Sequence, residues 1–229
     1  MDNSLLNSYG DRLVRASPGC GADIATQRVD DLDLMAIEHV SRLGNNCLAF
    51  DVACGLGGQA IRLAKAGAQV IAADIADLGV EVMARAEEAG VAAWVSYFKA
   101  DLRRLDEQIA DREFDIICCQ RAIHYLTWHE AVPAVGRLAL LLKPGGRLYL
   151  SASGIDSELG VGYSGRELAL PERYVPLSEA MAKKHSIEGP VCLYSLEDLK
   201  ALFLAAGLVP LDVFASPFRN VKGVASRAA

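Results

Sequence analysis

Three glycines stand close together in residues 49–60, which read AFDVACGLGGQA. Glycine lets the backbone approach a ligand closely and adopt positive φ angles. The apolar residues before the glycines predict a strand, and the residues after them predict a helix. Open α/β sheets bind ligands at such a turn, at the carboxyl end of a strand. The segment predicts a small-molecule site, although a tight turn without a ligand would have the same pattern.

Three carboxylates accompany this turn. Asp51 lies on the strand itself, Asp74 ends the next apolar run, 19 residues after Gly55, and Asp101 follows the third run. Asp74 stands about where an acidic residue accepts hydrogen bonds from ribose hydroxyls. Asp51 puts a negative charge where a pyrophosphate would be repelled and a cationic amino or sulfonium group would be favoured. The carboxylates therefore favour a ligand with both a ribose and a positive charge.

The segment from Gln120 to Tyr125 follows the fourth apolar run and could act on a second substrate. The ordinary pKa of histidine lies near neutrality, so His124 could accept a proton as a general base. Packing or hydrogen bonding is the competing role for His124, and we favour it. We expect Tyr125 to shape the pocket.

Seven short apolar runs predict the strands that position these groups: 47–52, 69–73, 94–98, 114–119, 147–151, 209–214 and 221–225. Helical patterns separate the first five, which indicates right-handed βαβ units in a parallel sheet. Residues 215–220 are too few for a parallel crossover, so the last two strands must form an antiparallel hairpin. We predict a doubly wound, mostly parallel seven-stranded sheet closed by this hairpin.

Apolar spacing and capping residues predict the helices. Residues 31–43 form one helix, with Leu34, Ile37 and Val40 facing inward and Gly44 after its end. A later helix carries its stripe on Val80, Met83, Ala84 and Glu87. Thr127 with Glu130, and Ser195 with Asp198, have the form of capping boxes that open two further helices.

Length and composition predict one domain, residues 1–229, with two additions. Residues 1–44 form an N-terminal cap, and residues 155–194 form an insertion without a clear period. A long structureless segment inside a compact domain is usually functional or disordered. We expect the insertion to be a lid that supplies the substrate pocket, together with Tyr9 near the chain start. Its candidate substrate residues are Tyr163, Arg166, Arg173 and Tyr174.

Charge and cysteine usage exclude several classes. The net charge of −6 disfavours binding to nucleic acid, and no apolar run is long enough to span a membrane. The six cysteines show no spacing that suits zinc, so we expect no metal, and we expect Cys118 and Cys119 to pack on opposite faces of a buried strand. The N-terminus does not read as a signal peptide. These features predict a reduced, cytoplasmic protein, and they leave the oligomeric state open.

The motifs together resemble the class I S-adenosylmethionine-dependent methyltransferases. The matching pieces are residues 51–57, Asp74, Asp101, residues 114–117 and residues 142–148. They follow the family's order and spacing over roughly 45–154 and again over 195–227. One departure is Ala53, where the family usually has glycine. A methyl group at that position is tolerable only if the φ of Ala53 is negative.

The resemblance implies a role for each matching residue. The groups that would hold the amino-acid end of S-adenosylmethionine are the backbone around Ala53, Gly55 and Gly57, the carboxylate of Asp51, and the carbonyl of Cys119 or the side chain of Gln120. Asp74 would accept from the ribose hydroxyls, with Ile75 against the adenine face. Asp101 would accept from the adenine amino group, with Leu102 beside the ring.

The expected function is therefore methyl transfer from S-adenosylmethionine to a small or medium-sized acceptor. The sequence leaves open whether the accepting atom is oxygen, nitrogen or carbon. Two alternatives stay open. Gly55, Gly57 and Ala60 also satisfy the dinucleotide pattern of nicotinamide-dependent oxidoreductases, although Asp51 and the C-terminal hairpin are not expected there. A non-catalytic cofactor-binding protein would have the same motifs.

Overall fold

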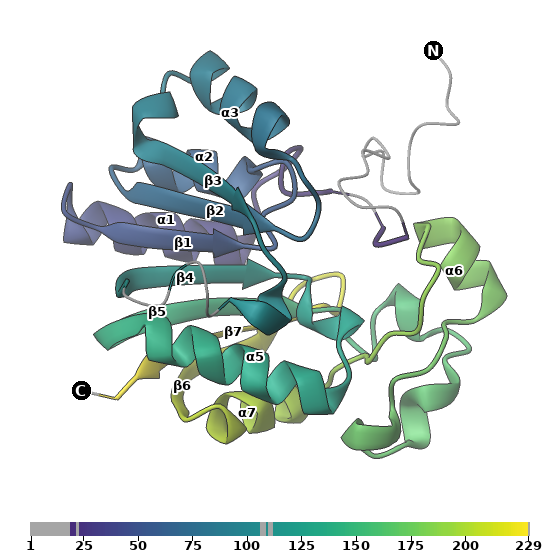
Figure 1. The fold of residues 1–229 in the computed structure, drawn as a ribbon. Helices are drawn as coiled ribbons and strands as arrows, with labels where there is room; N and C mark the ends of the chain where they lie inside the picture. The colour runs from purple at the N-terminus through teal and green to yellow at the C-terminus, as the bar shows by residue number, and fades with distance from the viewer. Residues whose placement is uncertain (1–18, 22, 106–108, 110–111, 229) are drawn as a thin grey trace, which may run out of the picture.

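The computed structural model describes residues 19–21, 23–105, 109 and 112–228. A single sheet of seven strands forms its centre, in the order β3-β2-β1-β4-β5-β7-β6 (Figure 1). The strands are β1 (Leu48–Val52), β2 (Gln69–Asp74), β3 (Val95–Lys99), β4 (Phe114–Gln120), β5 (Leu142–Ala152), β6 (Leu208–Ala215) and β7 (Val221–Arg227). The first five are parallel, and β7 pairs antiparallel with both β5 and β6. The predicted fold class is confirmed.

Helices cover both faces of the sheet (Figure 1). The described helices are α1 (Asp31–Leu43), α2 (Gly58–Lys65), α3 (Gly79–Glu88), α5 (Trp128–Leu141), α6 (Glu179–His185) and α7 (Leu196–Ala205). Helices α1, α2 and α3 pack into the core on one face, and α5 and α7 pack into the core on the other. No helix in the described ranges is long and apolar enough to cross a membrane.

Strand β4 shows why the central strands read as unbroken apolar runs. Ile117 and Cys119 belong to one core, whereas Ile116 and Cys118 belong to the other. Successive side chains of a strand point to opposite faces, so a strand covered on both sides needs apolar residues at every position. The opposite-face packing predicted for the two cysteines is confirmed.

The predicted helix starts are confirmed by their caps. The Thr127 side chain accepts from the Glu130 backbone, and the Glu130 side chain accepts from the Thr127 backbone. Ser195 and Asp198 form the same box at α7. Capping boxes satisfy two otherwise unpaired donors at the first turn, so they fix where a helix begins.

The predicted inward faces of α1 and α3 are partly wrong. Leu34 is 57% exposed, whereas Val40 is buried as predicted, and α1 also buries Leu32 and Ala36. Val80 is 83% exposed because α3 turns Val82 and Ala86 toward the sheet. Each helix has apolar residues on more than one side, so two different apolar faces fit the helical period. Contacts with the sheet decide which of these faces is buried.

Residues 155–194, the segment predicted to be a lid and called the lid below, lie beyond the carboxyl ends of the strands and have their own apolar cluster (Figure 1). Three short 3₁₀ helices (Glu158–Gly160, Ser164–Glu167 and Leu170–Glu172) and α6 build it. Its buried residues are Ile155, Leu159, Tyr163, Leu177, Ile187, Val191 and Leu193. The lid lacks a clear sequence period because it has short turns rather than long helices or strands.

Candidate functional site

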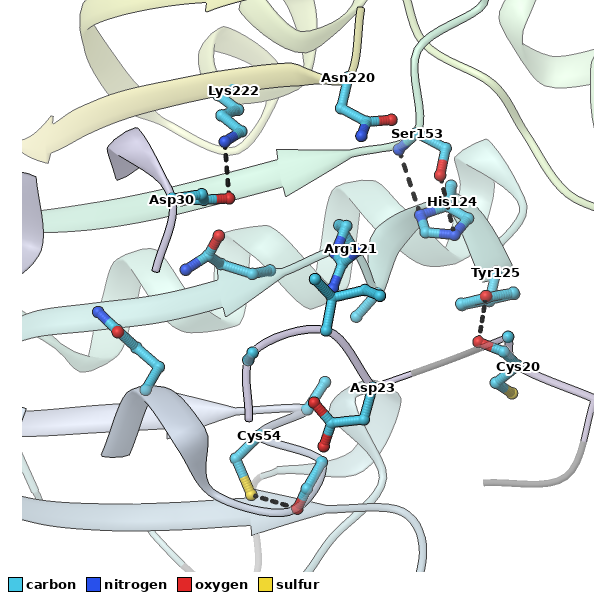
Figure 2. Close-up of a pocket in the computed structure, with 18 of the residues that line it drawn as sticks. Cys20, Asp23, Asp30, Cys54, Arg121, His124, Tyr125, Ser153, Asn220 and Lys222 are labelled. Carbon is cyan, nitrogen blue, oxygen red and sulfur yellow. Dashed lines mark hydrogen bonds and ion pairs between the residues drawn. The ribbon is translucent and has the colours of Figure 1, made fainter. Parts of the chain in front are cut away.

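A cavity of about 680 Å³ lies at the carboxyl ends of the parallel strands. Segments far apart in the sequence line it, as the close-up in Figure 2 shows in part. They include the glycine turn after β1, a strap formed by residues 23–30, the ends of β2 and β3 with the residues that follow them, the loop from β4 to α5, the lid, and the turn between β6 and β7. Both the parallel strands and the predicted lid therefore contribute to one cavity.

The glycine turn has the backbone that its sequence predicts, with one exception. Gly55 and Gly57 have φ angles of 53° and 78°. Ala53 has a φ of 56°, so the negative φ expected for it is wrong. A left-handed conformation costs a residue with a Cβ about 1–2 kcal/mol. Ala53 therefore adopts a backbone conformation that favours glycine, and the turn is strained at this residue.

Asp74 holds the glycine turn in place. One of its carboxylate oxygens accepts from the Gly55 backbone N–H at 2.9 Å, and the other accepts from the Ala76 N–H at 3.0 Å. Each carboxylate oxygen can accept a second hydrogen bond. Asp74 lines the cavity, so these remaining lone pairs can meet ribose hydroxyls.

Asp23 is a site residue that the sequence reasoning missed. It is buried, and its carboxylate accepts from the Leu56 N–H at 2.7 Å and from the Thr26 N–H at 3.2 Å. It thereby joins the strap to the glycine turn. No periodic pattern or motif surrounds it in the sequence, and only the fold brings it to a turn 33 residues away.

A cluster of carboxylates lies beneath the glycine turn. Burial, together with the charges of Asp33, Asp23 and Asp74, raises the pKa of Asp51 to about 8. Burial and the Asp30 charge also raise the pKa of Asp33. Within the described residues, one Asp51 oxygen (Oδ2) is buried and has no hydrogen-bond partner. A cationic ligand group would supply the partner and the charge that this cluster lacks.

The amide of Gln120 also faces this cluster, because its nitrogen donates to a carboxylate oxygen of Asp33. Gln120 lines the cavity, as predicted, whereas Cys119 is fully buried in the core and does not. Gly57 does not line it either. A Cβ added at position 57 would lie 3.0 Å from the Val82 side chain on α3, so the lack of a side chain at Gly57 lets α2 and α3 pack closely.

The predicted adenine residues Ile75, Asp101 and Leu102 line the cavity. The carboxylate of Asp101 is already paired with Arg103, whose two nitrogens donate to it at 2.7 and 3.0 Å. This hydrogen bonding lowers the pKa of Asp101. An adenine amino group would therefore share Asp101 with Arg103.

His124 is buried beside Ser153, whose hydroxyl lies 3.3 Å from its Nε2 and whose N–H lies 3.4 Å from its Nδ1 (Figure 2). Burial, with the charge of Arg121, lowers the pKa of His124 to about 3. The imidazole is thus neutral and a weak base at physiological pH. Tyr125 lines the cavity, and its hydroxyl donates to the Cys20 carbonyl.

The four lid residues predicted to bind substrate do not line the cavity. The Tyr163 hydroxyl donates to the Val191 carbonyl at 2.6 Å, and Arg173 pairs with Asp198. The structure uses these polar groups to tie the lid to itself and to α7.

The other two lid candidates have similar roles. Arg166 pairs with Asp156 at 2.9 Å, and the Tyr174 hydroxyl donates to the Tyr125 carbonyl at 3.1 Å. The lid residues that do reach the cavity are Ser157, Glu158, Leu159, Lys184, His185 and Ile187. Tyr9 lies outside the described residues.

A family model described as a methyltransferase domain matches residues 49–146. That range begins on β1, contains the glycine turn, Asp74 and Asp101, and ends on β5. The strand order and the antiparallel β7 supply the fold of the class I enzymes. Residues 49–146 are thus a methyltransferase domain, and they lie in a chain with the fold of the class I S-adenosylmethionine-dependent methyltransferases.

Solved structures share the fold of this methyltransferase domain. A Pyrococcus horikoshii protein superposes with a TM-score of 0.67 at 15% identity, over 92% of this chain and 94% of its own. A 1,6-didemethyltoxoflavin-N1-methyltransferase from Burkholderia thailandensis, solved with 1,6-didemethyltoxoflavin and S-adenosylhomocysteine bound, gives 0.64 at 18% identity, over 87% and 79%. An O-methyltransferase family protein from Burkholderia thailandensis gives 0.63 at 18% identity, over 86% and 57%. The chain thus spans little more than half of that last protein. A search of curated proteins found no match.

The residues of this cavity fit S-adenosylmethionine as the cofactor. The unpartnered oxygen of Asp51 and the raised pKa of its carboxyl suit a cationic ammonium beneath the glycine turn. Asp74, beside that turn, suits the ribose.

Proposed function

We propose that the methyltransferase domain transfers a methyl group from S-adenosylmethionine to a small organic acceptor held under the lid. The observation that carries this proposal is that one cavity is lined on one side by cofactor-binding candidates and on the other side by the lid. The glycine turn, Asp51 and Asp74 form the cofactor side, and lid residues such as Leu159 and Ile187 close the other side. A cavity of about 680 Å³ is within the range of small-molecule sites.

The cofactor supplies a methyl group bonded to a positively charged sulfur. This chain's residues position the two partners and exclude water, and such positioning is a large part of catalysis by proximity. Asp51 and Asp33 hold negative charge near the ammonium, Asp74 orients the ribose, and the lid covers the acceptor. His124 lies beside the acceptor space as a neutral group, so we assign it packing and hydrogen bonding rather than proton removal.

One of the solved structures is a 1,6-didemethyltoxoflavin-N1-methyltransferase with 1,6-didemethyltoxoflavin bound. It supports a small-molecule acceptor here by analogy of fold only. The single domain with cap and lid and the cytoplasmic location stay predictions from the sequence, which leaves the accepting atom open.

Thermal unfolding with separate ligands tests the proposal. S-adenosylmethionine and S-adenosylhomocysteine should each raise the melting temperature, because a ligand at 100 times its Kd adds about 2.7 kcal/mol of stability. NAD and NADP should not. Stabilisation by NAD alone would support the oxidoreductase alternative. Stabilisation by the sulfonium cofactor without formation of S-adenosylhomocysteine, across a broad panel of small acceptors, would support the non-catalytic alternative.

A further inference from the structure

Arg121 is the first residue after β4, and its side chain lines the cavity (Figure 2). Its φ is 51°, a conformation that residues with a Cβ rarely adopt. The Arg121 N–H donates to the carbonyl of Ser151 at 2.9 Å and lies 3.1 Å from the Ser151 hydroxyl. Strand β5 therefore fixes the strained backbone, and the side chain starts from a rigid point. Strain that the surrounding structure maintains in a cavity is typical of functional positions.

The guanidinium of Arg121 has no hydrogen bond or ion pair with any described residue, unlike the other cations of the cavity. Lys222 pairs with Asp30 and Asp31, Lys184 pairs with Glu158, and Arg103 pairs with Asp101. Arg28 lies 5.3 Å from the centre of the Phe218 ring. An arginine is always charged, and a partly buried charge without a partner is costly. The cavity therefore presents a positive group that an anionic ligand would neutralise.

The charge of Arg121 lies on the acceptor side of the cavity. It lowers the pKa of His124 and acts to lower that of Tyr125, so it is close to both. His124 and Tyr125 follow Arg121 in the loop from β4 to α5, and all three residues line the cavity.

We propose that Arg121 binds a carboxylate of the methyl acceptor, which makes the acceptor a small organic acid. This inference rests on the proposed function. A guanidinium and a carboxylate form two parallel hydrogen bonds, which orient as well as attract. Leu126, Leu159 and Ile187 line the same cavity and would pack against the apolar body of the acid. Lysine at position 121 would keep the charge but lose the paired geometry.

Pairs of probes that differ in one charged group test this inference. The pairs are benzoate with benzamide, cinnamate with cinnamamide, and indole-3-acetate with indole-3-acetamide. Calorimetry measures each Kd with and without saturating S-adenosylhomocysteine. In the wild-type protein at least one carboxylate should bind about tenfold more tightly than its amide, because hydrogen bonds to charged groups are the stronger ones. Arg121→Gln should abolish the difference, and Arg121→Lys should keep part of it.

Two further variants secure the interpretation. Arg219→Gln is the matched control, because Arg219 also has a positive φ, of 61°, but does not line the cavity. It should leave the carboxylate preference unchanged. Arg121→Gly relieves the strain, so it should melt no lower than the wild type and still lose the preference.

Three results would overturn the inference. One is the lack of a carboxylate preference in every probe pair, and another is a preference that survives Arg121→Gln. The third is a loss of at least tenfold in affinity for S-adenosylhomocysteine in Arg121→Gln but not in Arg219→Gln, which would assign Arg121 to the carboxylate of the cofactor. Failure of the wild type to bind S-adenosylhomocysteine would instead refute the proposed function, and this inference with it.

Discussion

Cofactor binding should release a proton from Asp51. Its carboxyl has a pKa of about 8 in the ligand-free chain, raised by burial and by neighbouring acids. About 90% of it is therefore protonated at pH 7 and about 10% at pH 9. A bound ammonium favours the ionised carboxylate, because an opposite charge nearby lowers the pKa. Binding of S-adenosylhomocysteine should release up to about 0.9 proton at pH 7 and about 0.1 at pH 9.

Titration calorimetry in buffers of different ionisation enthalpy measures this number directly. The slope of observed enthalpy against buffer ionisation enthalpy gives the protons exchanged on binding. Asp51→Asn should remove the release at pH 7. Asp101→Asn should not, because hydrogen bonding to Arg103 lowers the pKa of Asp101 and keeps it ionised throughout. A wild-type slope of zero at pH 7, with measurable binding, would refute the assignment of Asp51 to the ammonium.

The same raised pKa predicts how stability depends on pH. A carboxyl whose pKa is higher in the folded state stabilises the fold most below its unfolded pKa of about 4. That contribution is lost as the pH rises to about 8. The free energy of unfolding of the ligand-free wild type should therefore fall between these limits, by at most about 1.4 kcal/mol per pH unit from this group. Urea denaturation of Asp51→Asn should show a shallower decline, and equal declines would contradict the pKa shift.

Four other substitutions test the site. Ala53→Gly should raise the free energy of unfolding by about 0.5–1 kcal/mol in urea, because it removes left-handed strain, and a loss of stability would contradict the strain. Gly58→Ala should weaken cofactor binding at least about tenfold in calorimetry, because the added Cβ would lie 2.3 Å from the strap backbone. In the control Gly136→Ala, the added Cβ in α5 meets nothing within 4 Å, so cofactor affinity should not change. Asp74→Ala should cost about 1–3 kcal/mol of cofactor affinity, and an unchanged Kd in a folded variant would refute its role. His124→Ala should slow turnover by less than about 100-fold, and a rate loss that disappears at high pH would instead identify a general base.

The sequence predicted the sheet well because the signals for it are local. Strands buried on both faces must be apolar throughout, and a capping box fixes a helix start within four residues. The rotation of α1 and α3 could not be read in the same way. Leu34 and Val80 fit a helical stripe as well as Leu32 and Val82 do, and only the packed sheet selects between them.

The cofactor side of the site was predictable for the same reason. Asp51, Gly55 and Asp74 stand at strand ends, so strand prediction alone brings them to one edge. The lid was not predictable residue by residue. Tyr163 and Arg173 have the chemistry of ligand-binding groups, but a small lid core must satisfy its own carbonyls and carboxylates, and these two side chains do so.

The strap has no recognisable sequence motif, yet it contacts the glycine turn, which has one. Asp23 accepts from Leu56 inside the glycine turn, and the Ala25 carbonyl accepts from Arg62 on α2. Gly58 has no side chain, so the strap backbone lies directly against the start of that helix. The glycine turn is therefore held by Asp74 on one side and by the strap on the other. Lys222 on β7 pairs with Asp30 at the end of the strap, so the same strap also contacts the last strand of the chain.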